Sequence, residues 1–273
     1  CANIRKTSRR NRSYSKQKAF FHVDKGSFFD ECYNASNSYF MAFSLNEHQH
    51  KAASILDGPV LVLAGAGAGK TKTLTERIIN LIISGVRPQE ILAITFTNKA
   101  AGEMRDRVRD EIEKNPKLRF PVSEHQFTPF VSTFHALGVY ILREQYKTLE
   151  TSRYFTIYDR QDMKRAVKEA IAQCDLDPKA WDSKQIQTFI SRNKGNGKRL
   201  QDMSATDGEQ YGESYHRGTL IKIWAEYEKI KTQDQAYDFD DLLLVTAHLL
   251  KTNEQVRSHY QARWSFIHID EYQ

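Results

Sequence analysis

Residues 60–71 read Val-Leu-Val-Leu-Ala-Gly-Ala-Gly-Ala-Gly-Lys-Thr. The apolar half predicts a buried parallel strand, and the glycine-rich half predicts a tight loop that opens a helix. Glycine lets backbone N–H groups approach an anion closely, and the partly positive end of the following helix favours the same negative charge. We therefore expect residues 64–71 to bind the phosphates of a nucleoside triphosphate, although Ala64 stands where the usual pattern has glycine. A plain glycine-rich turn is the alternative.

Two side chains of this loop and two near the end of the sequence predict the chemistry of the site. Lys70 would neutralise the β- and γ-phosphates, and Thr71 would offer its hydroxyl to Mg²⁺. Residues 266–269 form a short apolar run, and Asp270 and Glu271 follow it directly. In phosphate-loop enzymes the first such acid holds Mg²⁺ and the second orients the attacking water, so we expect these two roles here. Two exposed carboxylates at a strand end are the alternative.

The spacing of apolar residues predicts an α/β fold with a parallel sheet. Helical periodicity follows the first two apolar runs, and Asn98 is expected to cap the second helix. Because strands and helices alternate, the strands should be parallel and their crossovers right-handed. Strands are expected at residues 60–63, 91–96 and 266–269, with a weaker one at 131–133.

The pattern changes between residues 137 and 235, where we expect three helices and no strand. Asp159 is the expected N-cap of the first helix. Residues 193–198 read Asn-Lys-Gly-Asn-Gly-Lys and predict an exposed loop. We expect its basic side chains, Lys194, Lys198 and the adjoining Arg199, to be solvated; contact with duplex phosphate is the alternative. We infer an all-helical insertion within the sheet domain, and we expect the two acids at residues 240–241 to cap or support the helix that returns the chain to the sheet.

Composition narrows the possible classes of protein. The 273 residues are 40% apolar and 27% charged, as in globular proteins, and three cysteines without metal-ligand spacing fit a reduced, cytoplasmic setting. Most of the formal net charge of +6 lies in residues 1–40, which hold eight Lys and Arg against three acids. We expect this basic leader to be disordered or non-native, with Met41 as the natural start; a nucleic-acid-binding arm is the alternative. We also expect a chain truncated after Gln273, because a buried strand seldom ends a protein.

Six short segments carry a more specific signal, because they occur together and in a fixed order. They are residues 45–49 (Leu-Asn-Glu-His-Gln), 64–71, 95–101 (Thr-Phe-Thr-Asn-Lys-Ala-Ala), 132–135 (Ser-Thr-Phe-His), 238–242 (Asp-Phe-Asp-Asp-Leu) and 270–273 (Asp-Glu-Tyr-Gln). From about residue 45 to residue 273, the series resembles the UvrD/Rep/PcrA family of superfamily 1 DNA helicases.

This resemblance implies a RecA-like P-loop NTPase domain, incomplete within these residues, and an all-helical inserted subdomain. It places the first RecA-like domain at residues 41–136 and 236–273, and the helical accessory subdomain at residues 137–235. It implies ATP and Mg²⁺ as ligands, single-stranded and duplex DNA as partners, and 3′ to 5′ movement. We expect no membrane association, because no stretch of the sequence approaches the ~20 apolar residues of a membrane-spanning helix. Protein partners and the pathway, whether replication or repair, are not indicated.

The resemblance also assigns roles to single residues. Gln49 matches the glutamine that recognises adenine, and its amide can pair with both a donor and an acceptor on the base. The implied ATP contacts are Gln49, Ala64, Gly65, Ala66, Gly67, Ala68, Gly69, Lys70, Thr71 and Lys72. The positions that match contacts to single-stranded DNA are Phe96, Asn98, Phe134 and His135. Aromatic faces stack on any base, which suits a motor that moves along any sequence; ordinary packing is the alternative for both phenylalanines.

Two other classes of function stay open. One is a P-loop ATPase of DNA repair or recombination without helicase activity, and the other is a non-catalytic DNA-binding module. An RNA helicase fits the Asp-Glu-Tyr-Gln segment less well. In the family, arginines from a second RecA-like domain reach the γ-phosphate, and such arginines contribute about 10³–10⁵ in rate. We therefore expect residues 1–273 alone to hydrolyse ATP negligibly.

Overall fold

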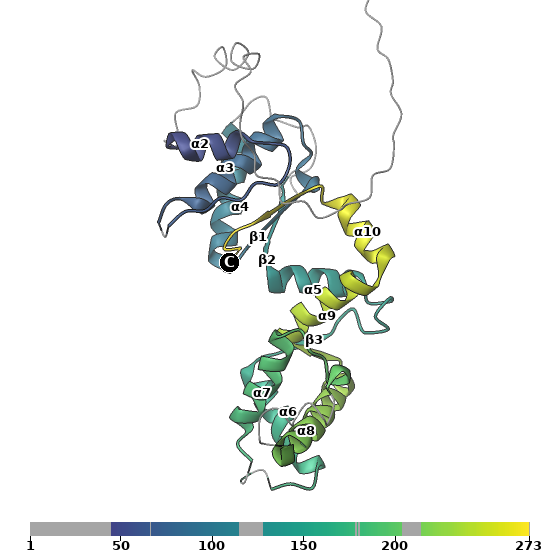
Figure 1. Cartoon of the computed structure of the whole chain (residues 1–273). Helices are drawn as coiled ribbons and strands as arrows, with labels where there is room; N and C mark the ends of the chain where they lie inside the picture. Colours follow the sequence, from purple (N-terminus) through teal and green to yellow (C-terminus); the bar gives the residue numbers. More distant parts are fainter. Residues whose placement is uncertain are drawn as a thin grey trace, which may run out of the picture. The chain divides into compact units, whose positions relative to one another are not determined.

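The computed structural model describes residues 45–65, 67–114, 128–177, 179, 181–203 and 214–272 (Figure 1). The predicted basic leader at residues 1–40, Ala66 of the predicted phosphate loop, and Gln273 lie outside these residues. Across the described ranges, none of the helices combines the length and the apolar character needed to cross a membrane.

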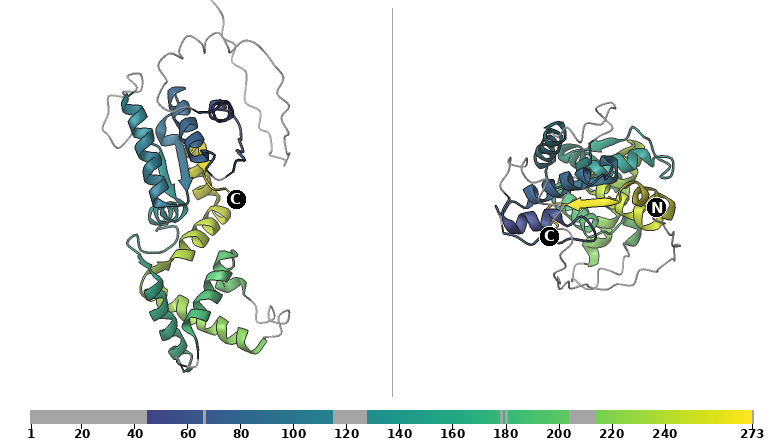
Figure 2. Two further views of the ribbon diagram at one scale, coloured as in Figure 1. Left: turned by 90° about the vertical axis from the view of Figure 1, so that its left-hand side faces the viewer. Right: turned by 90° about the horizontal axis from the view of Figure 1, so that it is seen from above.

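Three parallel strands form the main sheet, in the order β2-β1-β5. Their bounds are Ile91–Thr95 for β1, Phe130–Thr133 for β2 and Phe266–Ile269 for β5. Leu92 of β1 lies opposite both Phe130 and Ile267, so β1 is the central strand. In both views of Figure 2 the yellow C-terminal strand lies beside the blue N-terminal helices. The predicted α/β fold with a parallel sheet is confirmed.

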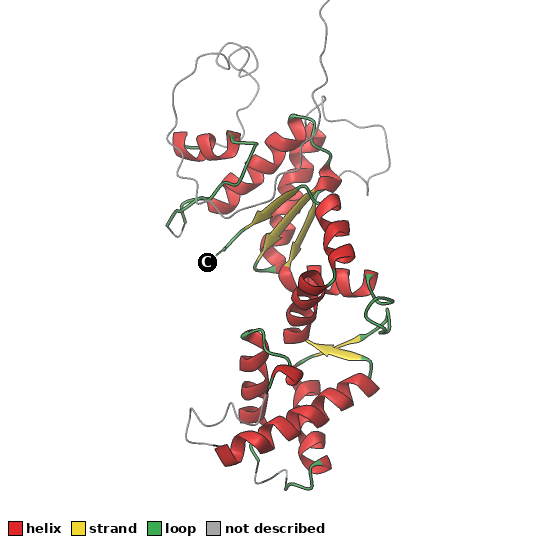
Figure 3. Cartoon of the chain, turned by 45° about the vertical axis from the view of Figure 1, so that its right-hand side comes forward, coloured by secondary structure: helices red, strands yellow, loops and turns green. Residues whose placement is uncertain are grey.

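Helices cover both faces of this sheet (Figure 3). Successive residues of β1 point to opposite faces, and all of them are buried, so both faces need a covering layer. One face is covered by α3 (Lys70–Ile83) and α4 (Asn98–Lys114), with α2 (Glu47–Ser54) packed on α3. The other face is covered by α5 (Phe134–Glu144), α9 (Phe239–Thr252) and α10 (Glu254–Arg263). Ile91 and Ala93 pack toward the first group, whereas Leu92 and Ile94 pack toward the second. A 3₁₀ turn, η1 (Pro88–Glu90), leads into β1.

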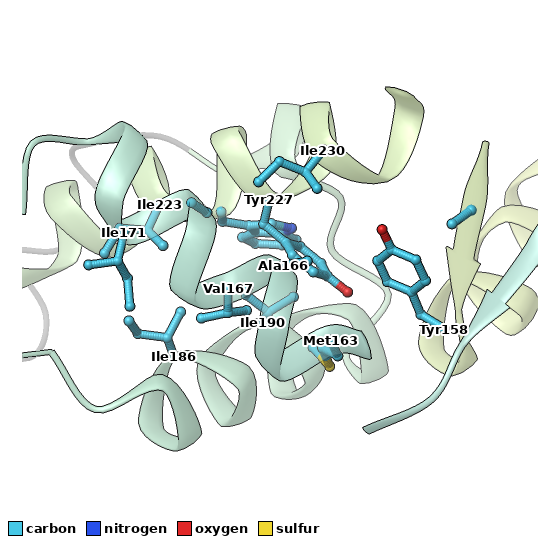
Figure 4. Close-up of a cluster of buried hydrophobic side chains, with 13 residues drawn as sticks. Tyr158, Met163, Ala166, Val167, Ile171, Ile186, Ile190, Ile223, Tyr227 and Ile230 are labelled. Atoms are coloured by element: carbon cyan, nitrogen blue, oxygen red, sulfur yellow. The ribbon is translucent and has the colours of Figure 1, made fainter. Parts of the chain in front are cut away.

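A second hydrophobic core holds the helical insertion together (Figure 4). It lies between α6 (Arg160–Gln173), α7 (Ser183–Gly195) and α8 (Ser214–Gln233), and the 3₁₀ turn η4 (Leu200–Asp202) follows α7. Its central side chains, fully excluded from solvent, are Val167, Ile171, Ile190, Trp224 and Tyr227. The predicted cap of α6 is confirmed, because the Asp159 carboxylate accepts hydrogen bonds from the backbone N–H groups of Gln161 and Asp162.

Two predictions for the insertion are wrong. It contains a strand, β3 (Thr156–Tyr158), which pairs in parallel with β4 (Ala236–Asp238). Three residues are too few to give a recognisable alternation, so sequence periodicity misses both strands. The predicted exposed loop at 193–198 also fails at its start, because α7 continues to Gly195 and Lys194 is 4% exposed. Buried carboxylates surround this lysine, and no local pattern reveals them.

Two further predictions fail in the sheet domain. Residues 60–63 are not a strand, and the side chains of Leu61 and Leu63 are 68% and 86% exposed. An apolar run becomes a strand only beside a hydrogen-bonding neighbour, and no described strand pairs with it. Asn98 is the first residue of α4 and not its cap. Thr97 has that role, because its Oγ1 accepts a 3.1 Å hydrogen bond from the N–H of Ala100.

Helices α5 and α9 approach each other closely at Gly138. A Cβ atom at this residue would lie 2.4 Å from the carbonyl oxygen of Leu242 and 3.3 Å from Oγ1 of Thr246. The nearer atom belongs to the α9 backbone, which cannot move without shifting the helix. The missing side chain therefore sets the distance between the two helices.

We expect Gly138→Ala to lower the free energy of unfolding by about 1–3 kcal/mol, because the added methyl group overpacks the contact between α5 and α9. Urea unfolding followed by circular dichroism would measure the change. Gly102→Ala is the matched control, since a Cβ atom in this helix meets only the Arg105 guanidinium at 3.9 Å. Equal stability of the two variants would contradict the close contact.

His268 on β5 is a buried titratable residue. It is 8% exposed, and its Nδ1 atom has no hydrogen-bond partner among the described residues. Burial, followed by the positive charge of Arg77, lowers the pKa of His268 from 6.5 to about 4. The folded chain therefore keeps this imidazole neutral in the pH range where the unfolded chain already protonates it.

This difference predicts an acid-sensitive stability. The contribution of the neutral His268 to the free energy of unfolding is fully present above pH 6.5 and is lost as the pH falls toward about 4. Between pH 7 and pH 5 the loss amounts to about 2 kcal/mol. His268→Leu should remove this part of the pH dependence in urea unfolding measured at both pH values. His48→Leu, on the exposed side of α2, should retain it, and an unchanged slope in His268→Leu would contradict the assignment.

Candidate functional site

The carboxyl ends of the three parallel strands bring predicted site residues to one edge of the sheet. β1 leads to Phe96, β2 leads to Phe134, and β5 leads to Asp270. The backbone N–H of Asp270 donates a 2.8 Å hydrogen bond to the carbonyl oxygen of Ile94, so pairing with β1 continues one residue beyond β5. Ligands of open parallel sheets bind at this edge, and the sheet itself positions the carboxylate there.

The glycine-rich loop before α3 contains two residues with left-handed backbones. The φ angle is +74° at Gly67 and +76° at Gly69, a region where glycine is unstrained. Gly69 is the N-cap of α3, so the start of this helix faces the loop without a capping side chain among the described residues. A helix N-terminus of this kind presents backbone N–H groups and a partial positive charge to an anion.

Lys70, the first residue of α3, folds back over the same loop. Its Nζ atom donates hydrogen bonds to the carbonyl oxygens of Ala64 at 3.4 Å and Gly65 at 3.3 Å. Both distances are long for such bonds, so the contacts are weak. A phosphate in the loop would offer this ammonium group shorter, charge-assisted hydrogen bonds.

Thr71 and Asp270 meet across 199 residues of sequence. The Thr71 hydroxyl donates a 2.8 Å hydrogen bond to Oδ2 of Asp270. Asp270 is 7% exposed, and its Oδ1 atom accepts a 3.2 Å hydrogen bond from the N–H of Glu271. The predicted loop and the first of the two predicted acids therefore lie at one site. There the Thr71 hydroxyl and the Asp270 carboxylate, both hard oxygen donors, lie side by side.

Glu271 follows with an unusual backbone conformation. Its φ angle is +54°, which side-chain-bearing residues rarely adopt, and the residue is exposed at the sheet edge. Such conformations concentrate at functional sites, where the surrounding structure enforces them.

Gln49 connects α2 to the loop. Its Nε2 donates a 2.8 Å hydrogen bond to the carbonyl oxygen of Ala68, and its Oε1 accepts one of 2.9 Å from the N–H of Asn46. A Cβ atom at Gly69 would lie 2.7 Å from this Nε2. The predicted adenine contact thus lies directly against the phosphate loop, and Lys72 follows in the first turn of α3.

Exposed aromatic side chains lie at the same sheet edge. Phe96 is 77% exposed and Phe134 is 41% exposed, so neither is an ordinary core residue. His135 is half-buried, and its ring meets that of Phe239 edge-on with centroids 5.6 Å apart. Asn98 is exposed in the first turn of α4.

Phe239 is the residue that sequence reasoning missed at this site. It is 52% exposed and begins α9, far from His135 in the sequence. Its place within the Asp-Phe-Asp-Asp-Leu segment was the available signal, but that segment indicated only helix capping. The contact depends on the packing of α9 against α5, which local patterns do not reveal.

Comparison with known proteins gives a match that begins and ends where the six ordered segments do. The family described as UvrD/REP helicase N-terminal domain matches residues 45–273. The chain is 35% identical over 230 residues to the ATP-dependent DNA helicase PcrA of Staphylococcus aureus, which covers 84% of the chain and 30% of that relative. It is 36% identical over 230 residues to PcrA of Bacillus subtilis, which covers 84% of the chain and 29% of that relative.

The chain thus spans about 30% of the length of these relatives. Six ordered segments, the parallel sheet and the site at its edge all fall within the matched residues. The chain belongs to the UvrD/REP helicase family.

Proposed function

We propose that the chain is the N-terminal, ATP-binding part of an ATP-dependent DNA helicase that moves 3′ to 5′ along single-stranded DNA and unwinds duplexes. The observation that carries this proposal is the 2.8 Å hydrogen bond between Thr71 and Asp270, beside the loop that holds Lys70. The relatives are named ATP-dependent DNA helicases, which supports ATP and DNA as ligands. The direction of movement rests on the family resemblance alone.

In this proposal the loop and α3 bind the triphosphate. Backbone N–H groups around Gly67 and Gly69 hold the phosphate oxygens, and Lys70 leaves its weak carbonyl contacts to neutralise the transferred phosphate. Gln49 lies against the loop at Ala68, which favours recognition of the attached adenine by its amide. The alternating glycines are needed because side chains would block the approach of backbone to anion.

Thr71 and Asp270 fit a magnesium ion, since Mg²⁺ prefers hydroxyl, carboxylate and phosphate oxygens. When bound, the ion would neutralise charge on the phosphates during hydrolysis. Glu271 orients the attacking water from the exposed side of the sheet edge. Its left-handed backbone supports this role, because rarely adopted backbone conformations concentrate at functional sites.

Single-stranded DNA would cross the aromatic residues at the sheet edge. Phe96, Phe134 and Phe239 offer exposed faces on which bases of any sequence can stack. His135 and Asn98 would add polar contacts. We propose the same domain division as the family resemblance implies, with the helical subdomain at 137–235 and RecA-like residues on both sides, except that α5 packs on the sheet and so belongs with the RecA-like residues.

Nucleotide affinity tests the ATP site. Lys70→Ala should raise the Kd of fluorescent mant-ATP with Mg²⁺ by roughly 10- to 100-fold, because hydrogen bonds to charged groups contribute about 1.5–3 kcal/mol. Asp270→Asn should remove most of the difference between titrations with Mg²⁺ and with EDTA. Lys164→Ala, on the exposed side of α6, serves as the control. Unchanged affinity in Lys70→Ala would overturn the site.

Activity of the longer protein separates the alternatives. If the longer protein is a helicase, Lys70→Ala should abolish its duplex unwinding. If it is an ATPase without helicase activity, the unsubstituted protein should hydrolyse ATP without unwinding a duplex. If it is a non-catalytic DNA-binding module, Lys70→Ala should leave its function unchanged. The 273-residue chain alone should bind ATP and show negligible DNA-stimulated hydrolysis. Rapid turnover by the chain alone would contradict the expected need for an arginine from a second domain.

Fluorescence anisotropy with labelled oligo(dT) tests the DNA surface. Phe96→Ala should raise the Kd roughly 5- to 100-fold, because stacking contributes about 1–3 kcal/mol per base. Tyr154→Ala is a matched control, since Tyr154 is also a strongly exposed aromatic residue but lies outside the sheet edge. Equal losses in the two variants would argue against a specific surface, and stronger binding to oligo(rU) would favour RNA.

A further inference from the structure

A buried ionic cluster lies where α7 and α8 end and α9 begins. Four of its charged residues are 2–4% exposed, and the fifth, Glu228, is partly buried. Two ammonium groups here face three carboxylates, and none of these residues takes part in the proposed ATP site. The members are Lys194, Glu228, Lys231, Asp238 and Asp241.

The two aspartates of this cluster also cap α9. Oδ1 of Asp238 accepts a 2.9 Å hydrogen bond from the N–H of Asp241, and Oδ2 of Asp241 accepts one of 3.0 Å from the N–H of Asp238. Oδ2 of Asp238 binds Nζ of Lys194 at 2.7 Å and Nζ of Lys231 at 3.2 Å. The same carboxylates therefore hold the helix end and both lysines.

The lysines make this buried cap possible. Lys194 also reaches Oδ1 of Asp241 at 2.7 Å, and Lys231 binds the other oxygen of the same carboxylate. Burial alone would raise the pKa of Asp238, but Lys231 and Lys194 outweigh it and hold that pKa below its ordinary value. Without the two lysines, both carboxylates would be buried, uncompensated charges at the start of α9.

The first turn of α9 leads directly to the proposed DNA surface. Phe239 follows Asp238 in the chain, and its ring meets His135 at a centroid distance of 5.6 Å. One turn later, the Leu242 carbonyl lies against Gly138, so the rest of α9 has little freedom to move relative to α5. Phe239 therefore lies between the ionic cluster at Asp238 and the α5 contact at Leu242.

We propose that Lys194 and Lys231 are positioning residues for DNA binding: by holding the capping carboxylates of α9, they fix Phe239 against His135. The helical insertion, which supplies both lysines, is thereby connected to the strand-binding edge of the sheet. This inference rests on the proposed function for the meaning of the surface, but the positioning itself can be measured without DNA.

The test uses the 273-residue chain with 4-fluorophenylalanine at position 239 and two readouts. Lys194→Met should shift the fluorine resonance, and it should raise the Kd for labelled oligo(dT) roughly tenfold with mant-ATP affinity unchanged within twofold. Lys198→Met, an exposed lysine four residues later, should change neither. In a Phe239→Ala background, Lys194→Met should cause no additional loss of DNA affinity, because both substitutions remove the same contact.

The fluorine and DNA-binding results test the positioning role and the proposed DNA surface separately. An unchanged fluorine resonance in Lys194→Met, or full additivity with Phe239→Ala, overturns the positioning role. A shifted resonance in a chain that binds no oligo(dT) supports the positioning and overturns the proposed DNA surface. If circular dichroism shows that Lys194→Met does not fold, Asp241→Asn makes the same test, since its amide oxygen still accepts from Asp238 but its charge is gone.

Discussion

The pairing of β5 with β1 determines where the proposed ATP site lies. It places Asp270 one residue beyond the strand, where its carboxylate meets the hydroxyl at the start of α3. Neither the loop nor the acid forms a site alone, because one supplies cationic and amide groups and the other supplies the anionic oxygen. Parallel strands with both faces covered make this meeting rigid, since β1 is buried along its whole length.

The sequence predicted those parts of the site whose chemistry is encoded locally. Loop glycines with a following lysine and threonine, and two acids after an apolar run, are recognisable without knowing their neighbours. Residues 60–63 show the limit, because apolar character predicts a strand but only a partner makes one. Phe239 and Lys194 were missed for a related reason. Their proposed roles depend on contacts between helices that are distant in the sequence.

Helix α9 is where the insertion and the sheet domain depend on each other. Lysines from α7 and α8 neutralise the carboxylate at its N-cap, Asp238. Its first turns touch α5 at Gly138, and its last turn packs on the sheet through Leu249. A residue that looks like surface charge in the sequence can therefore be a structural cation. Burial of Lys194 is stable only because several carboxylate oxygens surround it.

The central position of β1 has a consequence for synthesis on the ribosome. Ile91 is made early, but its partner Phe266 emerges only after the whole insertion, so one edge of β1 stays unpaired meanwhile. The insertion, whose helices contact one another over shorter separations, can fold first. Until β5 arrives, the half-built sheet exposes an open edge of the kind that chaperones protect and that aggregation exploits.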